Sequence, residues 1–152
     1  MNILVADLCN QGFDAVSAAG AASLEAAARE ADIVSCATLA TEPLICGRWL
    51  HAGSHLDLIG SFTPAMREAD DECFVGAALY IDSDEALAKS GDLLGPMSRG
   101  VFRATEVRGS LATLARNETT GRASANERTV FKSVGSALED LAAAMLVLSL
   151  TP

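Results

Sequence analysis

The chain has 152 residues, and half of them are hydrophobic, which is enough for one domain with a sizeable core. The formal net charge of −9 and the small share of aromatic residues argue against nucleic acid or an anionic membrane as partners. We find no apolar run long enough for a membrane span and no signal-peptide pattern, and we therefore expect a cytoplasmic protein.

The first half of the chain alternates between predicted helices and short strands. Leu4, Val5 and Leu8 have helical spacing and predict a helix over 2–11, although 3–5 could instead be a strand. Ser23 can cap the helix predicted over 24–31. Further elements follow in order: strands over 14–18, 33–37, 56–59 and 78–81, and helices over 66–75 and 84–90.

The pattern is weaker after Leu94. Gly95-Pro96 and the polar run 117–126 predict loops around one short helix over 109–116. A strand then begins at Thr129, turns at Ser133-Val134-Gly135 and leads into a helix over 134–150. One apolar stripe is predicted along that helix: Val134, Leu138, Leu141, Met145 and Leu148. The alternation of strands and helices predicts an α/β fold with a mostly parallel sheet.

The strand, turn and helix around Ser133 predict a binding position. A turn of this kind presents backbone N–H groups at a helix N-terminus, where α/β proteins hold phosphates, carboxylates and cofactor edges. Lys132, beside the turn, could neutralise a cofactor phosphate or a substrate carboxylate, or could be purely structural.

Three other groups of residues could carry chemistry, but structural roles are favoured for each. The cysteines have no C-x-x-C spacing and are expected to be buried free thiols: Cys9, Cys36, Cys46 and Cys73. His51 and His55 lie in a loop, so we expect no shared metal site. The charged run around Arg67, Glu68 and 70–72 could be an acid/base or metal cluster, but a solvated helix start is favoured. Asp92, after Gly91, has the look of a turn residue.

Several blocks occur in the order found in one enzyme family. They are A-D-I-V-S-C-A-T at 31–38, G-R-W-L at 47–50, H-L-D-L-I-G-S at 55–61, P-A-M-R-E-A-D-D-E at 64–72, S-G-D-L-L at 90–94, and the segment 129–144. Together they resemble the ornithine cyclodeaminase/mu-crystallin family of nicotinamide-dependent enzymes. The resemblance covers most of the chain, and six blocks in order leave little room for chance.

The resemblance implies a Rossmann-like sheet with flanking helices and, in the complete family enzyme, NAD or NADP as cofactor. The family's Gly-x-Gly-x-x-Gly/Ala fingerprint is absent. We therefore expect a truncated fold without the first two strands and the N-terminal domain. It would comprise a partial Rossmann-like domain over 1–128 and a C-terminal strand-turn-helix segment over 129–152. Its protein partner would be a second copy, since the family forms dimers, or the missing N-terminal half.

The resemblance also suggests which residues contact the cofactor. Ligands of open α/β sheets bind outside the carboxyl ends of the strands, where 38–43 and 60–64 lie. The family places its cofactor there, which implies contacts from Thr38, Leu39 and Ile59, with Gly60 beside them and Ser133 near the nicotinamide. In the competing interpretation Thr38 only caps a turn and Gly60 only permits a bend.

Phe62 is the strongest argument against one of the activities that the resemblance implies, ornithine cyclodeamination. True ornithine cyclodeaminases have a catalytic Asp in this loop, and a phenyl ring cannot transfer a proton. The version Ser61-Phe62-Thr63-Pro64 resembles the family's Δ1-pyrroline-2-carboxylate reductases, which pass hydride from NAD(P)H to a cyclic imino acid. No catalytic residue is assigned. The alternatives are ornithine cyclodeamination, which yields proline and ammonia, and a non-catalytic binding protein of mu-crystallin type.

Overall fold

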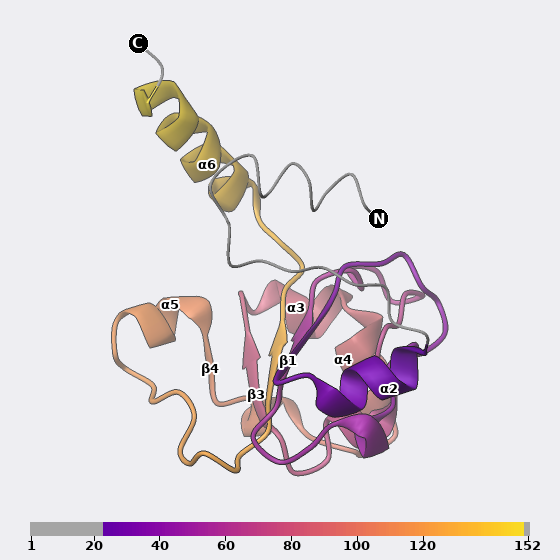
Figure 1. Cartoon of the computed structure of the whole chain (residues 1–152). Helices are drawn as coiled ribbons and strands as arrows, with labels where there is room; N and C mark the ends of the chain where they lie inside the picture. Colours follow the sequence, from indigo (N-terminus) through magenta and orange to yellow (C-terminus); the bar gives the residue numbers. More distant parts are fainter. Residues whose placement is uncertain (1–22, 151–152) are drawn as a thin grey trace, which may run out of the picture.

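The computed structural model describes residues 23–150, and the helix and strand predicted over 2–18 lie outside this range. Within it, five strands form one sheet in the order β1-β2-β5-β3-β4, and all neighbouring strands pair in parallel (Figure 1). The strands are β1 (Ile33–Cys36), β2 (His55–Leu58), β3 (Ala78–Ile81), β4 (Gly109–Ser110) and β5 (Thr129–Lys132). The parallel sheet with helical connections confirms the predicted α/β class.

The helices in the described range are short, except for the last. They are α2 (Leu24–Glu30), α3 (Glu85–Lys89), α4 (Gly91–Ser98), α5 (Leu111–Ala115) and α6 (Ala137–Leu150), with 3-10 turns at Gly47–Trp49, Asp71–Cys73 and Ala104–Glu106. The sequence placed α2, α3, β1, β2 and β3 correctly to within one or two residues. As expected, the Ser23 hydroxyl caps α2 by accepting from the Ala26 N–H at 3.2 Å.

The helix predicted over 66–75 is wrong: only Asp71–Cys73 forms a 3-10 turn there. The backbone N–H groups that a helix would use have tertiary partners instead. Those of Glu68 and Ala69 donate to the Asp92 carboxylate at 2.9 and 3.1 Å, and that of Asp70 donates to the Ile45 carbonyl at 2.9 Å. These bonds hold the segment extended against the core.

Three predictions after Lys89 also need correction. Gly95-Pro96 lies inside α4 and not in a loop. Asp92 is buried at the start of α4 and does not lie in a loop turn. The helix predicted over 109–116 is shorter, because Gly109 and Ser110 form β4 beside Tyr80 and Ile81.

The two faces of the sheet differ in cover. Leu58, Lys132 and Ile81 are neighbours on β2, β5 and β3, share one face and are fully buried. On the opposite face, Asp57 and Phe131 are only half-buried. The core therefore lies on the first face, and it contains a lysine. The domain boundary predicted at Thr129 stays a prediction, although β5 lies in the interior of the common sheet.

The last helix, α6, extends away from the sheet (Figure 1). None of its residues is buried, and its exposed side chains include Leu138, Leu141 and Met145. The helix begins at Ala137 and not at 134, and Val134 packs against the core. The rest of the predicted apolar stripe faces solvent. Across residues 23–150 no helix combines the length and apolarity needed to span a bilayer.

Candidate functional site

A cleft of about 430 Å³ opens where β1, β2 and β5 end, at the carboxyl edge of the sheet. We call it the loop-end cleft, and its lining residues are Ala37, Thr38, Leu39, Ile59, Gly60, Phe62, Ser133, Val134, Gly135 and Glu139. The structure thus brings together all five predicted cofactor contacts, which are separated by up to 95 positions in the sequence (133 − 38 = 95). This edge is the position where parallel α/β sheets bind ligands.

The loops after β1 and β2 approach each other very closely. The Ile59 N–H donates to the Cys36 carbonyl at 2.8 Å, and this bond carries the strand pairing into the loops. At Gly60 an added Cβ would overlap the Thr38 backbone and the Glu68 carboxylate. Gly60 is therefore required by the close contact between the two loops, and a bend alone does not account for it.

We expect Gly60→Ala to lower the free energy of unfolding by roughly 1–3 kcal/mol or more, because a methyl group there overpacks the junction of the loops. Urea unfolding followed by circular dichroism measures the loss. The matched control is Gly121→Ala, since a Cβ at that position meets no atom within 4 Å. Equal stability of the two variants would contradict the close packing at Gly60.

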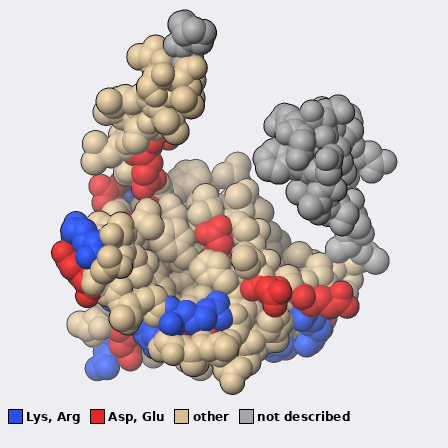
Figure 2. Space-filling model, turned by 60° about the vertical axis from the view of Figure 1, so that its left-hand side comes forward, with Lys and Arg blue, Asp and Glu red and all other residues tan. Residues whose placement is uncertain are grey.

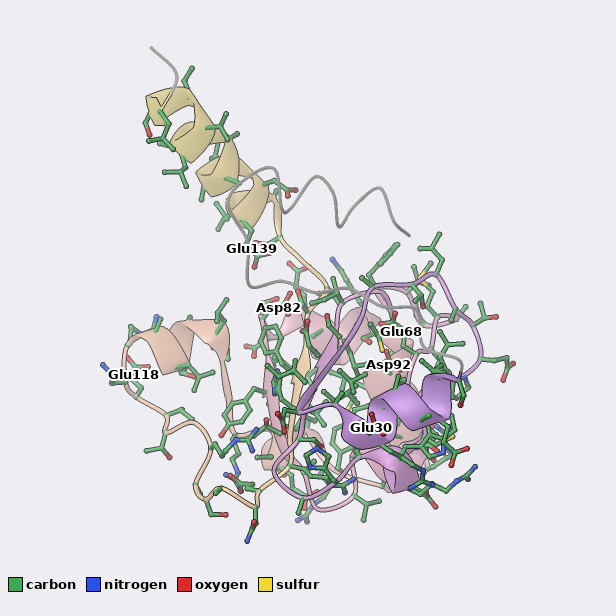
Figure 3. All side chains as sticks on the ribbon, viewed as in Figure 1. Glu30, Glu68, Asp82, Asp92, Glu118 and Glu139 are labelled. Atoms are coloured by element: carbon green, nitrogen blue, oxygen red, sulfur yellow. The ribbon has the colours of Figure 1, made fainter. Side chains whose placement is uncertain are left out.

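The other wall of the cleft is the turn after β5, which Asp82 holds. The Asp82 Oδ2 atom accepts from the Ser133 hydroxyl at 2.9 Å and from the N–H groups of Val134 and Gly135 at 2.7 and 2.8 Å. Glu139 accepts from the Ser136 N–H at 3.2 Å. Figure 3 shows Asp82 and Glu139 at this end of β5. The N–H groups that the sequence suggested for a bound anion are thus donated to the protein's own carboxylates.

The two hydroxyl groups of the cleft keep some capacity to accept hydrogen bonds. Thr38 Oγ1 donates to Glu68 at 2.8 Å and accepts from the Ala40 N–H at 3.2 Å. Ser133 Oγ donates to Asp82 and accepts from the Gly135 N–H at 3.1 Å. Because a hydroxyl oxygen can accept two hydrogen bonds, each has one acceptor position left for a ligand N–H or O–H group. Thr38 therefore does cap a turn, as the competing interpretation held, without being fully used by it.

Among residues 23–150, no lysine or arginine lines the loop-end cleft. Lys132 is fully buried, and its ammonium group donates to the Leu58 carbonyl at 2.9 Å, 3.9 Å from Asp92 Oδ2. Burial lowers the pKa of Lys132, against the opposing effect of Asp92 and Glu68. Of the roles that the sequence left open for Lys132, the structural one is correct. The cleft suits an uncharged, flat group with hydrogen-bond donors better than a phosphate.

The charged run 67–72 is neither a metal cluster nor a solvated helix start. Glu68 is fully buried, and Asp71 forms ion pairs with Arg67 and Arg99. The Arg99 hydrogen bonds, with those of Arg67, lower the pKa of Asp71 to about 2. Asp70 accepts from the Gly47 and Cys73 N–H groups and so joins two 3-10 turns. The run therefore has structural contacts at each of these positions.

The cysteines of the described range are free, and its two histidines have different hydrogen-bond partners. Cys36 and Cys73 are buried free thiols, as predicted, whereas Cys46 is partly exposed. Burial, the largest cause, raises the pKa of Cys36 to about 11. The ring nitrogen Nδ1 of His51 lies 2.8 Å from the Ala52 carbonyl, and that of His55 lies 2.7 Å from Thr129 Oγ1. Cys9 lies outside the described residues.

Sequence reasoning did not identify the three carboxylates that organise the site, Glu68, Asp82 and Asp92. A clue exists only for Asp82, which directly follows the buried strand β3 at the edge where ligands bind. Glu68 stands in a run of charged residues, where a surface position is the usual expectation.

Comparisons with a family model and with known proteins agree with the family resemblance found in the sequence. Residues 5–150 match the model of the ornithine cyclodeaminase/mu-crystallin family. The Δ1-pyrroline-2-carboxylate reductase of Paracoccus denitrificans is 45% identical over 134 residues, which cover 86% of this chain and 42% of the relative. The ketimine reductase mu-crystallin of Rattus norvegicus is 38% identical over 126 residues, covering 82% of this chain and 37% of the relative.

A solved structure agrees with the sequence matches. The Δ1-pyrroline-2-carboxylate reductase of Thermococcus litoralis, in complex with NADH and L-proline, superposes with a TM-score of 0.78 at 37% identity. The match covers 82% of this chain and 39% of that protein. The predicted Rossmann-like fold is confirmed, and the chain spans about two fifths of the length of the curated relatives it matches.

Proposed function

Because the chain belongs to the ornithine cyclodeaminase/mu-crystallin family, we propose that it forms the nicotinamide side of the cofactor site of an NAD(P)H-dependent reductase of cyclic imino acids. The substrate would be of the Δ1-pyrroline-2-carboxylate type, and the product the corresponding cyclic amino acid. The observation that carries the proposal is the convergence of Thr38, Leu39, Ile59, Gly60 and Ser133 on one cleft at the carboxyl edge of the sheet. Relatives named for this reaction support it.

The residues of the cleft fit the nicotinamide end of the cofactor. Apolar side chains of Leu39, Ile59 and Phe62 can pack on the flat ring, and the missing side chain at Gly60 allows close approach. The spare acceptor positions of Thr38 and Ser133 suit the carboxamide N–H groups and the ribose hydroxyls. The bound cofactor supplies the hydride, while these residues orient the ring and exclude water from one face of it.

Binding of the substrate carboxylate and of the cofactor pyrophosphate needs groups beyond those described in the cleft. Its described lining residues include no cation to bind a substrate carboxylate or a pyrophosphate, and the sequence contains no Gly-x-Gly-x-x-Gly. Orientation of both reactants supplies much of the rate of such a reaction. We therefore expect no measurable reduction of Δ1-pyrroline-2-carboxylate by this chain alone, followed as loss of NADH or NADPH absorbance.

Complementation tests the proposal directly. The purified chain is mixed with the part of the Paracoccus denitrificans reductase that precedes the matched region, and imine reduction is measured. Activity should appear only in the mixture, and it should be lost when the chain carries Gly60→Ala. Turnover by the chain alone at ordinary enzyme rates would contradict the proposal that it forms only the nicotinamide side of the site. The absence of both NADH binding and complementation would contradict the proposed function and leave a non-catalytic binding role.

Phe62 favours reduction over ornithine cyclodeamination. It lines the cleft and is 45% exposed. The family resemblance aligns it with the Asp that takes part in the chemistry of the cyclodeaminases. We expect the Phe→Asp change at the corresponding position of a full-length reductase not to create cyclodeaminase activity, because that reaction also needs ammonia release and ring closure in a reshaped pocket. The assay is proline formation from ornithine, with the unchanged reductase as control. Robust proline formation by the single variant would show that Phe62 alone separates the two activities.

A further inference from the structure

Glu68 is a fully buried carboxylate that joins the two loops of the cleft. Its Oε1 atom accepts from the Thr38 N–H at 2.6 Å and from the Thr38 hydroxyl at 2.8 Å. Its Oε2 atom accepts from the Gly60 N–H at 2.8 Å. One side chain thus receives three hydrogen bonds from the ends of two neighbouring strands, β1 and β2. Near these strand ends, the backbone of the two segments is also joined by the bond from the Ile59 N–H to the Cys36 carbonyl.

The backbone of Glu68 is itself held in place by Asp92. Asp92 Oδ1 accepts from the N–H groups of Glu68 and Ala69, and Figure 3 shows Glu68 and Asp92 next to each other. Asp92 is fully buried, and its second oxygen lies 3.9 Å from the Lys132 ammonium group. Lys132 in turn donates to the Leu58 carbonyl at the end of β2. The chain of contacts runs from the core through Asp92 to Glu68 and ends at the cleft.

We propose that Glu68 is a positioning residue, which sets the distance and orientation of Thr38 and Gly60 and thereby the shape of the loop-end cleft. It acts through these two residues, because it is fully buried and both of its oxygens are already used. The nicotinamide as the group received there rests on the function proposed above. The positioning of the loops does not.

The chemistry of the contacts requires a carboxylate at this position. Three donors converge on two acceptor oxygens, and an amide offers only one acceptor oxygen while its NH₂ group would face a donor. Glu68→Gln keeps the size of the side chain but leaves at least one N–H of Thr38 or Gly60 without an acceptor. A hydrogen bond to a charged group is stronger than a neutral one, so its loss has a local effect.

Amide hydrogen exchange of the whole chain by NMR tests the positioning role. In Glu68→Gln we expect exchange at Thr38 and Gly60 to become at least about tenfold faster, while Val134 on the opposite wall changes little. The matched control is Asp57→Asn, the same chemical change in β2, where the carboxylate accepts from the Ser35 hydroxyl at 2.7 Å on the other face of the sheet. Unchanged exchange at Thr38 and Gly60 in Glu68→Gln would overturn the proposal.

A second variant decides the case if Glu68→Gln does not fold. Thr38→Val removes the hydroxyl bond to Glu68 and the bond that the hydroxyl accepts from the Ala40 N–H. Because Glu68 also binds the Gly60 N–H, exchange at Gly60 in the neighbouring loop should become faster, by a smaller factor. No change at Gly60 would then overturn the proposal. An NADH titration separates the two claims: Glu68→Gln should weaken binding at least about tenfold, and Asp57→Asn should not. If the unchanged chain neither binds NADH nor complements the reductase part, the proposed function fails, and the exchange data alone decide the role of Glu68.

Discussion

Lys132→Met lowers the free energy of unfolding by roughly 3–5 kcal/mol, the largest loss that we expect from a single substitution in this chain. Lys132 and Asp92 are both fully buried, and no other described cation forms an ion pair with Asp92. Methionine fills a similar volume, so the cost comes from charge and hydrogen bonding: the variant leaves the Asp92 carboxylate buried without a counter-charge and the Leu58 carbonyl without its donor.

Urea unfolding of Lys132→Met, Asp92→Asn and the double variant measures this coupling. The double variant should be more stable than Lys132→Met, because asparagine removes the uncompensated charge while its oxygen can still accept from the Glu68 and Ala69 N–H groups. Lys89→Met is the matched control: Lys89 pairs with Glu85 on the surface, and we expect a change within about 0.5 kcal/mol. A loss below about 1 kcal/mol for Lys132→Met would contradict the buried pair.

The pH dependence gives an independent check. Burial raises the pKa of Asp92 above its ordinary value of 3.8, with Lys132 opposing the shift. Between the unfolded and the folded pKa the folded state binds more protons, so this group makes the protein more stable as the pH falls through the folded pKa. Lys132→Met removes the opposing charge and raises the folded pKa further. The difference in stability between the variant and the unchanged protein should therefore shrink as the pH is lowered from neutral towards the ordinary pKa of an aspartate.

The position of the candidate site could be predicted from the sequence because it depends on connectivity. Thr38 and Gly60 directly follow apolar runs that form β1 and β2, and the ends of parallel strands meet at one edge of a sheet. Ser133 follows β5 in the same way, although β5 is last in the sequence and lies between β2 and β3 in the sheet. The positions of these residues could therefore be predicted without knowledge of side-chain contacts.

The polar network beneath the site could not be predicted, because it depends on contacts between distant residues. Glu68 stands between Arg67 and 70–72, and a run of charges indicates a surface until Asp92, 24 positions later, is seen to bind its backbone. The same bonds explain why no helix forms over 66–75. At Pro96 the sequence predicted a loop where a helix forms. Proline is in general unfavourable inside helices but is accommodated in α4.

The helix α6 should make the chain self-associate. Leu138, Leu141, Met145 and Leu148 recur at spacings of three and four, form one stripe and are each more than half exposed. The only charged residues of the helix are Glu139 and Asp140 in its first turn, and Figure 2 shows the rest of α6 without charge. Burying a Leu or Met side chain contributes about 1.5–3 kcal/mol. Four such residues from each of two copies exceed the lower estimates of the cost of association, which is about 4–15 kcal/mol.

Size-exclusion chromatography with light scattering measures the association at several protein concentrations. We expect the unchanged chain to form dimers or larger species at tens of micromolar. The double variant Leu141→Glu/Met145→Glu should be a monomer with an unchanged circular dichroism spectrum. The control is Val75→Glu, which adds a charge at another exposed apolar residue, 57% exposed, outside the stripe. It should leave the association intact, because a single exposed apolar residue is ordinary on a protein surface whereas a contiguous stripe is not. A monodisperse monomer of the unchanged chain would mean that the stripe does not bind a second copy. Equal association of the double variant would place the contact elsewhere, with β1, an edge strand of the described sheet, as the next candidate.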